Sequence, residues 1–180
     1  MKRLSLALLL AAVCLQSALA QPPIFIVRHA EKAEANAANP KDPDLSATGR
    51  ARAQALAETL KDAGIGAIFV TEYKRTRQTA EPTADLRAIE PVTIPAQEVT
   101  TLVAKLKETK EAALVVGHSN TVPEILKALG ASDSITIAES DYDNLFIVAA
   151  GTPPRLIRLH LPAAEQKPAT GKAASASAGD

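Results

Sequence analysis

Short, wholly apolar runs recur along this chain, and stretches with the spacing of an amphipathic helix separate them. Four of these runs lie at residues 24–27, 67–70, 113–116 and 145–148. Strands buried on both faces have this composition, because neither of their faces meets water. Strands that alternate with helices form a sheet with helices packed on it. The pattern therefore predicts a three-layer α/β/α sandwich with a mostly parallel central sheet.

The stretches between the strands carry apolar side chains at helical spacing. One example is the set Ala53, Leu56, Ala57 and Leu60. Such spacing predicts helices over 46–62, 74–85, 99–106 and 122–129, with Gly64 as a C-cap of the first and a short strand at 92–94. The last two apolar runs, 145–148 and 156–161, flank a Gly-Thr-Pro-Pro turn. We expect them to pair as a C-terminal antiparallel hairpin.

Both ends of the chain differ in composition from the part between them. Lys2 and Arg3 precede an apolar run, and Ala18-Leu19-Ala20 follows it, which is the order of a secretory signal peptide cleaved after Ala20. An apolar helix packed on the domain and a retained membrane anchor are the alternatives for 1–20. Residues 163–180 are rich in Ala, Ser, Gly and Lys, which predicts a disordered tail. The folded domain is then expected over 21–162, in the periplasm or outside the cell.

Composition excludes several kinds of chemistry. The single cysteine, Cys14, lies in the expected signal peptide, so the mature chain would have neither a disulfide nor a thiol nucleophile. Without Lys2 and Arg3, 18 basic residues face 20 acidic ones, a net charge of −2. No overall positive field favours nucleic acid. A site for anions must therefore be local.

Basic side chains and histidines follow three of the predicted strands. Arg28 and His29 end the first, Arg75 follows the second, and His118 ends the strand at 113–116. Each alone is compatible with a surface or structural role. Ligands in such sheets bind at the carboxyl ends of the strands, where helix N-termini favour anions and arginine binds phosphate oxygens with two N–H groups. Together the four side chains predict a phosphate pocket.

The helix that begins near residue 74 carries two arginines. Arg75, Gln78 and Thr79 share one face of it, whereas Arg77 points elsewhere. We therefore expect Arg75 to enter the pocket. For Arg77 we expect a surface salt bridge, with Glu81 one turn later as the candidate partner.

Four segments together resemble one family. They are Arg28-His29-Ala30-Glu31, Leu45-Ser46-Ala47-Thr48-Gly49-Arg50, Tyr73-Lys74-Arg75-Thr76-Arg77-Gln78-Thr79-Ala80 and Gly117-His118-Ser119. In this order they are similar to the motifs of the histidine phosphatase superfamily, the phosphoglycerate-mutase-like proteins. The resemblance covers roughly residues 24–161.

The resemblance implies a role for each of these side chains. His29 is the nucleophile that becomes phosphohistidine, and Arg28, Arg75 and His118 hold the phosphoryl oxygens. No cofactor is implied. The histidines lack the paired spacing of a zinc site, so no metal is expected either, and His160 is expected to be structural.

The group that protonates the leaving alcohol is not evident. Some members of the family place an Asp directly after the second histidine, but this chain has Ser119 there. Others place a Glu in the segment before that histidine, which makes Glu98 the candidate acid. A carboxylate that merely favours a helix N-terminus is the alternative for Glu98. Glu31 and Asp143 are further candidates.

The expected activity is hydrolysis of small phosphomonoesters at an open, shallow site, because 79–114 is short and the chain has no Trp. The alternatives are a phosphohistidine protein phosphatase and a non-catalytic module that binds phosphate or a sugar phosphate. No nucleic acid, obligate protein partner or stable membrane association is expected after signal cleavage.

Overall fold

The computed structural model describes residues 21–34, 41–131 and 134–162. The predicted signal peptide at 1–20 and the predicted tail at 163–180 lie outside these ranges and remain predictions. Within the described ranges, no helix is both long and apolar enough to cross a bilayer.

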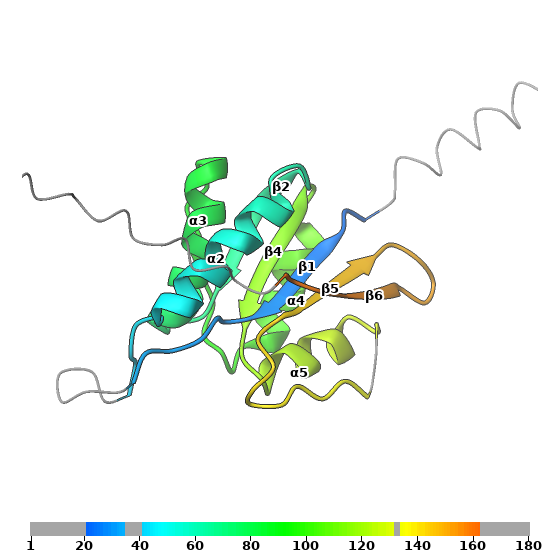
Figure 1. The fold of residues 1–180 in the computed structure, drawn as a ribbon. Coiled ribbons are helices and arrows are strands. Elements are labelled where there is room, and N and C mark those ends of the chain that lie inside the picture. The colour runs from blue at the N-terminus through cyan, green and yellow to red at the C-terminus, as the bar shows by residue number, and fades with distance from the viewer. Residues whose placement is uncertain (1–20, 35–40, 132–133, 163–180) are drawn as a thin grey trace, which may run out of the picture.

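The described chain alternates strands and helices as its sequence pattern predicts. In order, the elements are β1 (Ile24–Arg28), α2 (Ala47–Leu60), β2 (Ile65–Val70), α3 (Lys74–Arg87), β3 (Val92–Thr93), α4 (Val99–Glu108), β4 (Ala112–Gly117), α5 (Thr121–Ala128), β5 (Asn144–Ala149) and β6 (Arg155–His160) (Figure 1). The three-layer fold and every expected helix and strand are confirmed.

The six strands form one sheet in the order β3-β2-β4-β1-β5-β6. β1, β2, β3 and β4 run parallel, and β1 pairs with β4 from Ile24↔Ala113 to Arg28↔Gly117. Because their carboxyl ends meet at one edge, the residues that follow β1, β2 and β4 come together there. The predicted phosphate pocket depends on this edge.

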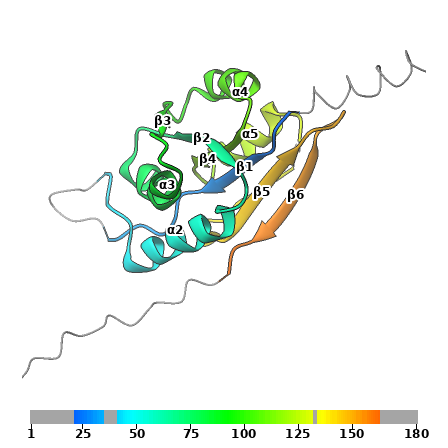
Figure 2. The same cartoon turned by 90° about the horizontal axis from the view of Figure 1, so that it is seen from above.

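Helices cover both faces of the sheet (Figure 2). Leu56 and Leu60 of α2 pack with α3 and one face of the sheet in one apolar core. Ile125 and Leu126 of α5 pack with α4 and the other face in a second core. β4 is buried along its whole length between these two layers, which explains why its sequence is wholly apolar.

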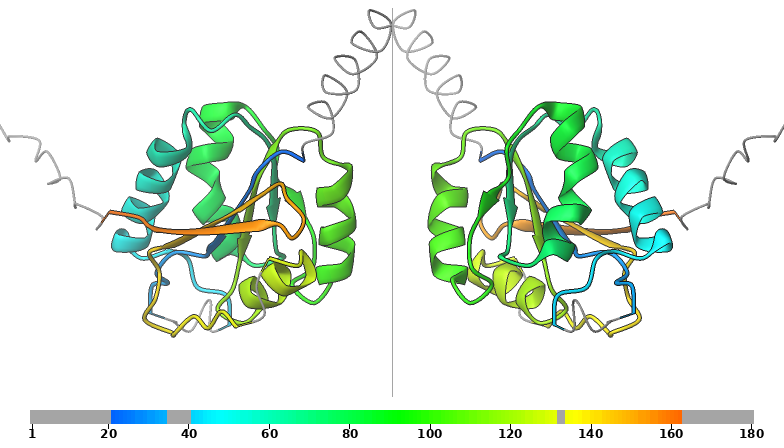
Figure 3. Two further views of the ribbon diagram at one scale, coloured as in Figure 1. Left: turned by 90° about the vertical axis from the view of Figure 1, so that its right-hand side faces the viewer. Right: turned by 90° about the vertical axis from the view of Figure 1, so that its left-hand side faces the viewer.

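β5 runs opposite to β1, and β6 pairs antiparallel with β5 at the edge of the sheet. Figure 3 shows this hairpin between the two helix layers. Leu145 pairs with Val27, so β5 begins at the edge where β1 ends. Residues 134–143, which lead into β5, therefore reach the carboxyl edge of the parallel strands. The expected C-terminal hairpin is confirmed.

The first helix begins with a side-chain cap and ends earlier than the sequence pattern predicts. The Ser46 side chain accepts a hydrogen bond from the Gly49 N–H, which satisfies a free donor of the first turn. The prediction that Gly64 caps this helix is wrong: α2 ends at Leu60, Lys61 is its C-cap, and Gly64 lies in the following turn. With φ at +68°, Gly64 provides the left-handed backbone that this turn requires.

Candidate active site

His29 directly follows β1 and lies at the centre of the carboxyl edge. Its backbone N–H donates to the Gly117 carbonyl (2.9 Å), which fixes it beside the end of β4. Its Nδ1 lies 2.8 Å from the Ala30 carbonyl oxygen. A carbonyl oxygen only accepts, so Nδ1 carries the proton in the neutral ring, and Nε2 keeps a lone pair. No described residue forms a hydrogen bond with Nε2.

His118 directly follows β4, and its ring centroid lies 5.3 Å from that of His29, edge to face. Its Nε2 lies 3.0 Å from Thr71 Oγ1 and its Nδ1 lies 3.5 Å from an Arg75 nitrogen. Because the guanidinium can only donate, Nδ1 is the acceptor, and the Nε2–H donates to Thr71. The Thr71 hydroxyl lies in turn 3.0 Å from that of Thr76. This chain of hydroxyls fixes both the orientation and the tautomer of His118.

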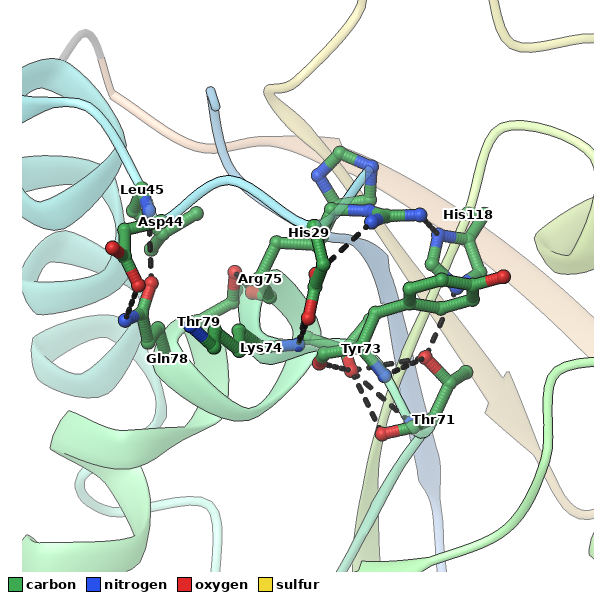
Figure 4. A network of polar contacts seen from close by, with 12 residues as sticks. His29, Asp44, Leu45, Thr71, Tyr73, Lys74, Arg75, Gln78, Thr79 and His118 are labelled. Carbon is green, nitrogen blue, oxygen red and sulfur yellow. Dashed lines mark hydrogen bonds and ion pairs between the residues drawn. The ribbon is translucent and has the colours of Figure 1, made fainter. Parts of the chain in front are cut away.

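Arg75 lies in the first turn of α3 and points toward His118 (Figure 4). Its guanidinium lies 4.1 Å from the centre of the Tyr73 ring, and the same ring meets His118 edge to face at 5.3 Å. On its other side Arg75 donates to Asp42 (3.4 Å), which also accepts from the Lys74 N–H at the start of the helix. Tyr73 and Asp42 thus hold Arg75 in a fixed direction.

Gln78 and Thr79 position the loops around the site rather than line it. The Thr79 hydroxyl accepts from the Ala30 N–H (2.9 Å) and so anchors the residue after His29. Gln78 accepts from the Leu45 N–H and donates to Asp44. Of the three residues predicted to share a face of α3, Arg75 lines the pocket, whereas Gln78 and Thr79 hold the chain between β1 and α2.

Arg28 is almost fully buried, and the segment before β5 surrounds its guanidinium. Its Nη1 donates to the carbonyls of Ala138 (2.8 Å), Glu139 (2.9 Å) and Asp141 (3.3 Å). Its Nη2 donates to the Glu139 carboxylate (2.7 Å), and the Tyr142 ring lies 4.2 Å away. Arg28 borders the predicted pocket. Its guanidinium, which is expected to bind a phosphoryl oxygen, donates to the Glu139 carboxylate instead.

A cavity of about 450 Å³ joins the ends of β1 and β4 and the start of α3. All four predicted phosphate-pocket residues line it: Arg28, His29, Arg75 and His118. Burial, together with the positive charge of Arg75, lowers the pKa of His29 to about 3. The same two causes lower the pKa of His118 to about 4. Both rings are therefore neutral at pH 7 beside two permanent cations.

None of the three carboxylates considered as the acid lines this cavity. Glu98 is exposed, is the N-cap residue of α4 and borders a small neighbouring apolar pocket instead. Glu31 forms a two-pronged ion pair with Arg52 (2.6–3.0 Å). Asp143 pairs with His160 (3.0 Å).

The partner expected for Arg77 is wrong. Arg77 does form a surface ion pair, but with Glu90 (3.1 Å), and it also donates to Thr93 (3.3 Å). These partners lie in and just before β3, which runs alongside β2, and the lateral packing brings them closer than Glu81 one turn away on the same helix.

Sequence analysis missed several polar residues around the cavity, and two of them contact its predicted arginines. Asp42 comes from the loop before α2, and Glu139 comes from the segment before β5. Neither follows a parallel strand, whereas the strand pattern indicates only residues that do. The antiparallel hairpin was a usable signal, because the start of a reversed strand lies at the same edge as the ends of its parallel neighbours.

Among the described residues, no group of three or more His, Cys, Asp or Glu side chains could hold a metal ion.

Several solved structures share this fold. A candidate phosphohistidine phosphatase, SixA, from Agrobacterium tumefaciens has a TM-score of 0.60 and 22% identity over 77% of this chain and 98% of its own. A protein histidine phosphatase SixA complexed with tungstate has a TM-score of 0.62 and 20% identity over 78% and 97%. A mycobacterial glucosyl-3-phosphoglycerate phosphatase with inorganic phosphate has a TM-score of 0.59 and 13% identity over 81% and 99%. At these identities the likeness concerns the fold.

The sequence of the N-terminal part of the described chain is similar to one family. No curated protein matches the chain at a significant level. Residues 24–98, which include Arg28, His29 and Arg75, match the model of the histidine phosphatase superfamily (branch 1). This segment, which carries three of the four pocket side chains, is therefore similar to that superfamily.

Proposed function

We propose that this chain is a phosphatase that hydrolyses phosphomonoesters through a phosphohistidine formed on His29. One observation carries the proposal: a buried, neutral imidazole donates its Nδ1–H to a backbone carbonyl, and its Nε2 has no hydrogen-bond partner among the described residues. A nucleophile needs a lone pair and a fixed direction, and the Ala30 contact provides both.

In the proposed first step, the Nε2 lone pair of His29 attacks phosphorus in line with the leaving oxygen. The N–P bond forms as the P–O bond to the leaving group breaks. Water then attacks the phosphohistidine, inorganic phosphate leaves, and the electron pair returns to Nε2. Because the pKa of His29 is about 3, the ring is available as a nucleophile at neutral pH without a separate base.

The side chains around His29 are suited to the charge of a transferring phosphoryl group. Arg75 presents a guanidinium, and its buried Nε–H has no partner among the described residues. Such donors are uncommon in folded proteins, and an oxyanion beside it would satisfy this one. A bound phosphoryl dianion would also raise the pKa of His118, which could then donate from Nδ1. Fixed donors of this kind stabilise transition-state charge.

A phosphohistidine protein is the second candidate substrate. Two proteins with this fold are a candidate phosphohistidine phosphatase SixA and a protein histidine phosphatase SixA. A nitrogen leaving group has different needs from an alcohol, so the two substrate classes can be separated by rate. We favour small phosphomonoesters because the proposed export would separate the enzyme from cytoplasmic phosphoproteins.

The test uses the purified chain without residues 1–20. We expect phosphate release from p-nitrophenyl phosphate without added metal, and acid-labile, base-stable ³²P on the protein after rapid quenching. His29→Ala should lower kcat/KM by at least about 10⁴-fold, because the nucleophile is lost. Undiminished turnover by folded His29→Ala would refute the mechanism, and tight phosphate binding with no turnover would identify a binding module instead.

Export to the periplasm or beyond is part of the proposal. Its support is the order of basic start, apolar run and small-residue site in residues 1–20. Expression of the full chain followed by fractionation and N-terminal sequencing tests it. A mature N-terminus at Gln21 in the exported fraction is expected, and an uncleaved cytoplasmic chain would contradict it.

A further inference from the structure

The residue after the second histidine is bonded to a carboxylate from a distant segment. Ser119 Oγ donates to Glu139 Oε1 over 2.6 Å. The two residues are 20 positions apart, and the reversed direction of β5 brings the Glu139 segment to this edge. Ser119 cannot act as an acid at neutral pH, but it holds a carboxyl group, which can donate a proton when its pKa is raised.

Glu139 lies against the proposed phosphoryl site as well. Its other oxygen, Oε2, accepts from Arg28 Nη2 over 2.7 Å, and both residues line the cavity with His29. Its side chain is 81% exposed, so it can rotate without leaving a buried gap. A phosphoryl group bound by Arg28 would therefore have the Glu139 carboxyl group as a neighbour.

We propose that Glu139, positioned by Ser119, is the proton donor to the leaving oxygen. This inference rests on the proposed phosphatase function and deepens it. Glu98 and Glu31 do not line the cavity, and Glu31 is paired with Arg52. Glu124 of α5 also lines it, but Glu139 is the lining carboxylate that is bonded to both Arg28 and Ser119.

The protonation of Glu139 depends on what occupies the cavity. In the structure described here, the Ser119 hydrogen bond and the charge of Arg28 lower the pKa of Glu139, so it is ionised, and Lys32 acts in the same direction. A phosphoryl group that binds Arg28 in place of Glu139 removes the stabilising effect of the Arg28 charge and adds a negative charge nearby. Both changes raise the pKa of a carboxyl group. Substrate binding thus favours the protonated form of the carboxyl group, which is the one that catalysis needs.

The two steps balance in protons and charge. In the first, the N–P bond forms, the P–O bond breaks, and the Glu139 proton passes to the leaving alkoxide, which gives the alcohol and a carboxylate. In the second, the carboxylate takes a proton from the water that attacks phosphorus. The P–N bond breaks, phosphate leaves, and Glu139 is again protonated. The same residue therefore serves both steps, as microscopic reversibility allows.

The experiment compares two esters whose leaving groups differ in their need for a proton. p-Nitrophenolate leaves without one, whereas the alkoxide of glycerol 2-phosphate does not. In Glu139→Gln we expect kcat/KM for glycerol 2-phosphate to fall about 10²–10³-fold, the range of general acid catalysis, and that for p-nitrophenyl phosphate to change less than about threefold. Ser119→Ala should show a smaller loss with the same selectivity, which a merely structural role would not produce. Glu98→Gln tests the competing carboxylate, and Glu58→Gln on the outer face of α2 is a charge-matched control.

Four results would overturn the inference. They are an equal loss on both esters in Glu139→Gln, no loss on either, the selective loss appearing in Glu98→Gln, and a wild-type protein that does not hydrolyse glycerol 2-phosphate. All four leave the proposed function intact, provided that His29-dependent hydrolysis of p-nitrophenyl phosphate is present. Absence of that hydrolysis would instead remove the proposed function, and this inference with it.

Discussion

The two sides of the cavity are built in different ways. On the α3 side, the set Thr71, Arg75 and His118 is buried or half-buried, follows parallel strands and is fixed by neighbouring hydroxyl, ring and carboxylate contacts. On the β5 side, Ser119 and Glu139 are more exposed, and the Glu139 carboxylate holds Arg28 through one ion pair. In the proposed mechanism, the rigid side would face the phosphoryl group, whose charge changes in place, and the looser side would face the leaving group.

This difference suggests a division of tasks. Fixed donors are most effective where charge develops at a constant position, as on the phosphoryl oxygens. A proton donor must instead change partners during the cycle, which an exposed side chain does at low cost in packing. Variants on the α3 side should therefore affect every substrate, whereas variants of Glu139 should discriminate between leaving groups.

Among the variants that distinguish the two sides of the cavity, Arg75→Ala is expected to have the largest effect on both esters. Loss of this guanidinium should lower kcat/KM by about 10²–10³-fold for p-nitrophenyl phosphate and glycerol 2-phosphate alike, because the phosphoryl oxygens are common to both. Steady-state kinetics on the two esters measures it. Arg77→Ala, two residues away with an exposed ion pair, is the matched control and should stay within about twofold of wild type. A loss confined to one ester would remove the distinction between the two sides.

Tungstate binding provides a measurement that does not depend on turnover. A phosphate-like oxyanion should bind beside His29 and Arg75 and stabilise the folded protein by about 2.7 kcal/mol at 100 times its Kd. Thermal unfolding followed by circular dichroism at constant ionic strength reports the rise in Tm. Arg75→Ala should show a much smaller rise than Glu139→Gln. An equal rise in both variants would mean that the oxyanion lies elsewhere.

Thr71→Val tests the hydroxyl chain behind His118. The His118 Nε2–H loses its acceptor, and the ring is no longer held in one tautomer, so we expect about a tenfold loss in kcat/KM. The loss should again be equal for both esters. Far-ultraviolet circular dichroism should confirm the fold, because the substitution also removes a partner of Thr76. Unchanged kinetics would show that His118 needs no such support.

The smallest expected effect is that His29 and His118 do not titrate in the pH range in which an ordinary histidine does. Because the pKa of His29 is about 3 and that of His118 about 4, both rings should stay neutral from pH 7 to 5. Their ring ¹H and ¹⁵N shifts, assigned with His29→Ala and His118→Gln, should change little over this range. A midpoint near 6.5 for either ring would contradict the proposed electrostatics of the site.

The same pKa shifts have a consequence for folding. In the unfolded chain both rings would take up protons near pH 6.5, whereas in the folded chain they do so only near 3 and 4. The unfolded state therefore binds more protons as the pH falls below about 6.5, and the free energy of unfolding should decline there. Denaturant unfolding at pH 7 and 5 measures the decline.

The parallel half of the molecule was predictable because its signals are local. The apolar runs that became β1, β2 and β4 end next to Arg28, His29 and His118, so the strand pattern and the topology together indicate the pocket. The partners of these side chains were not predictable. Tyr73 and Asp42 hold Arg75 through three-dimensional contacts between loops whose paths no periodicity specifies.

The β5 half shows the same limit more clearly. Glu139 lies in a segment without regular spacing, and its contacts with Arg28 and Ser119 span 111 and 20 positions. The exposed Glu98 matched a family pattern in the chain but lies outside the cavity. Glu98 was a candidate because of its position along the chain, whereas Glu139 is a candidate because the direction of β5 brings it to the cavity.

The reversed direction of β5 also affects how such a chain can vary. Residues 134–143 form part of the connection between α5 and β5, which lies outside the pairing of β1 with β4. Its length and composition can change without altering the register that sets His29 beside Gly117. Substitutions in 134–143 could therefore change which leaving groups the protein accepts, while His29 keeps its position.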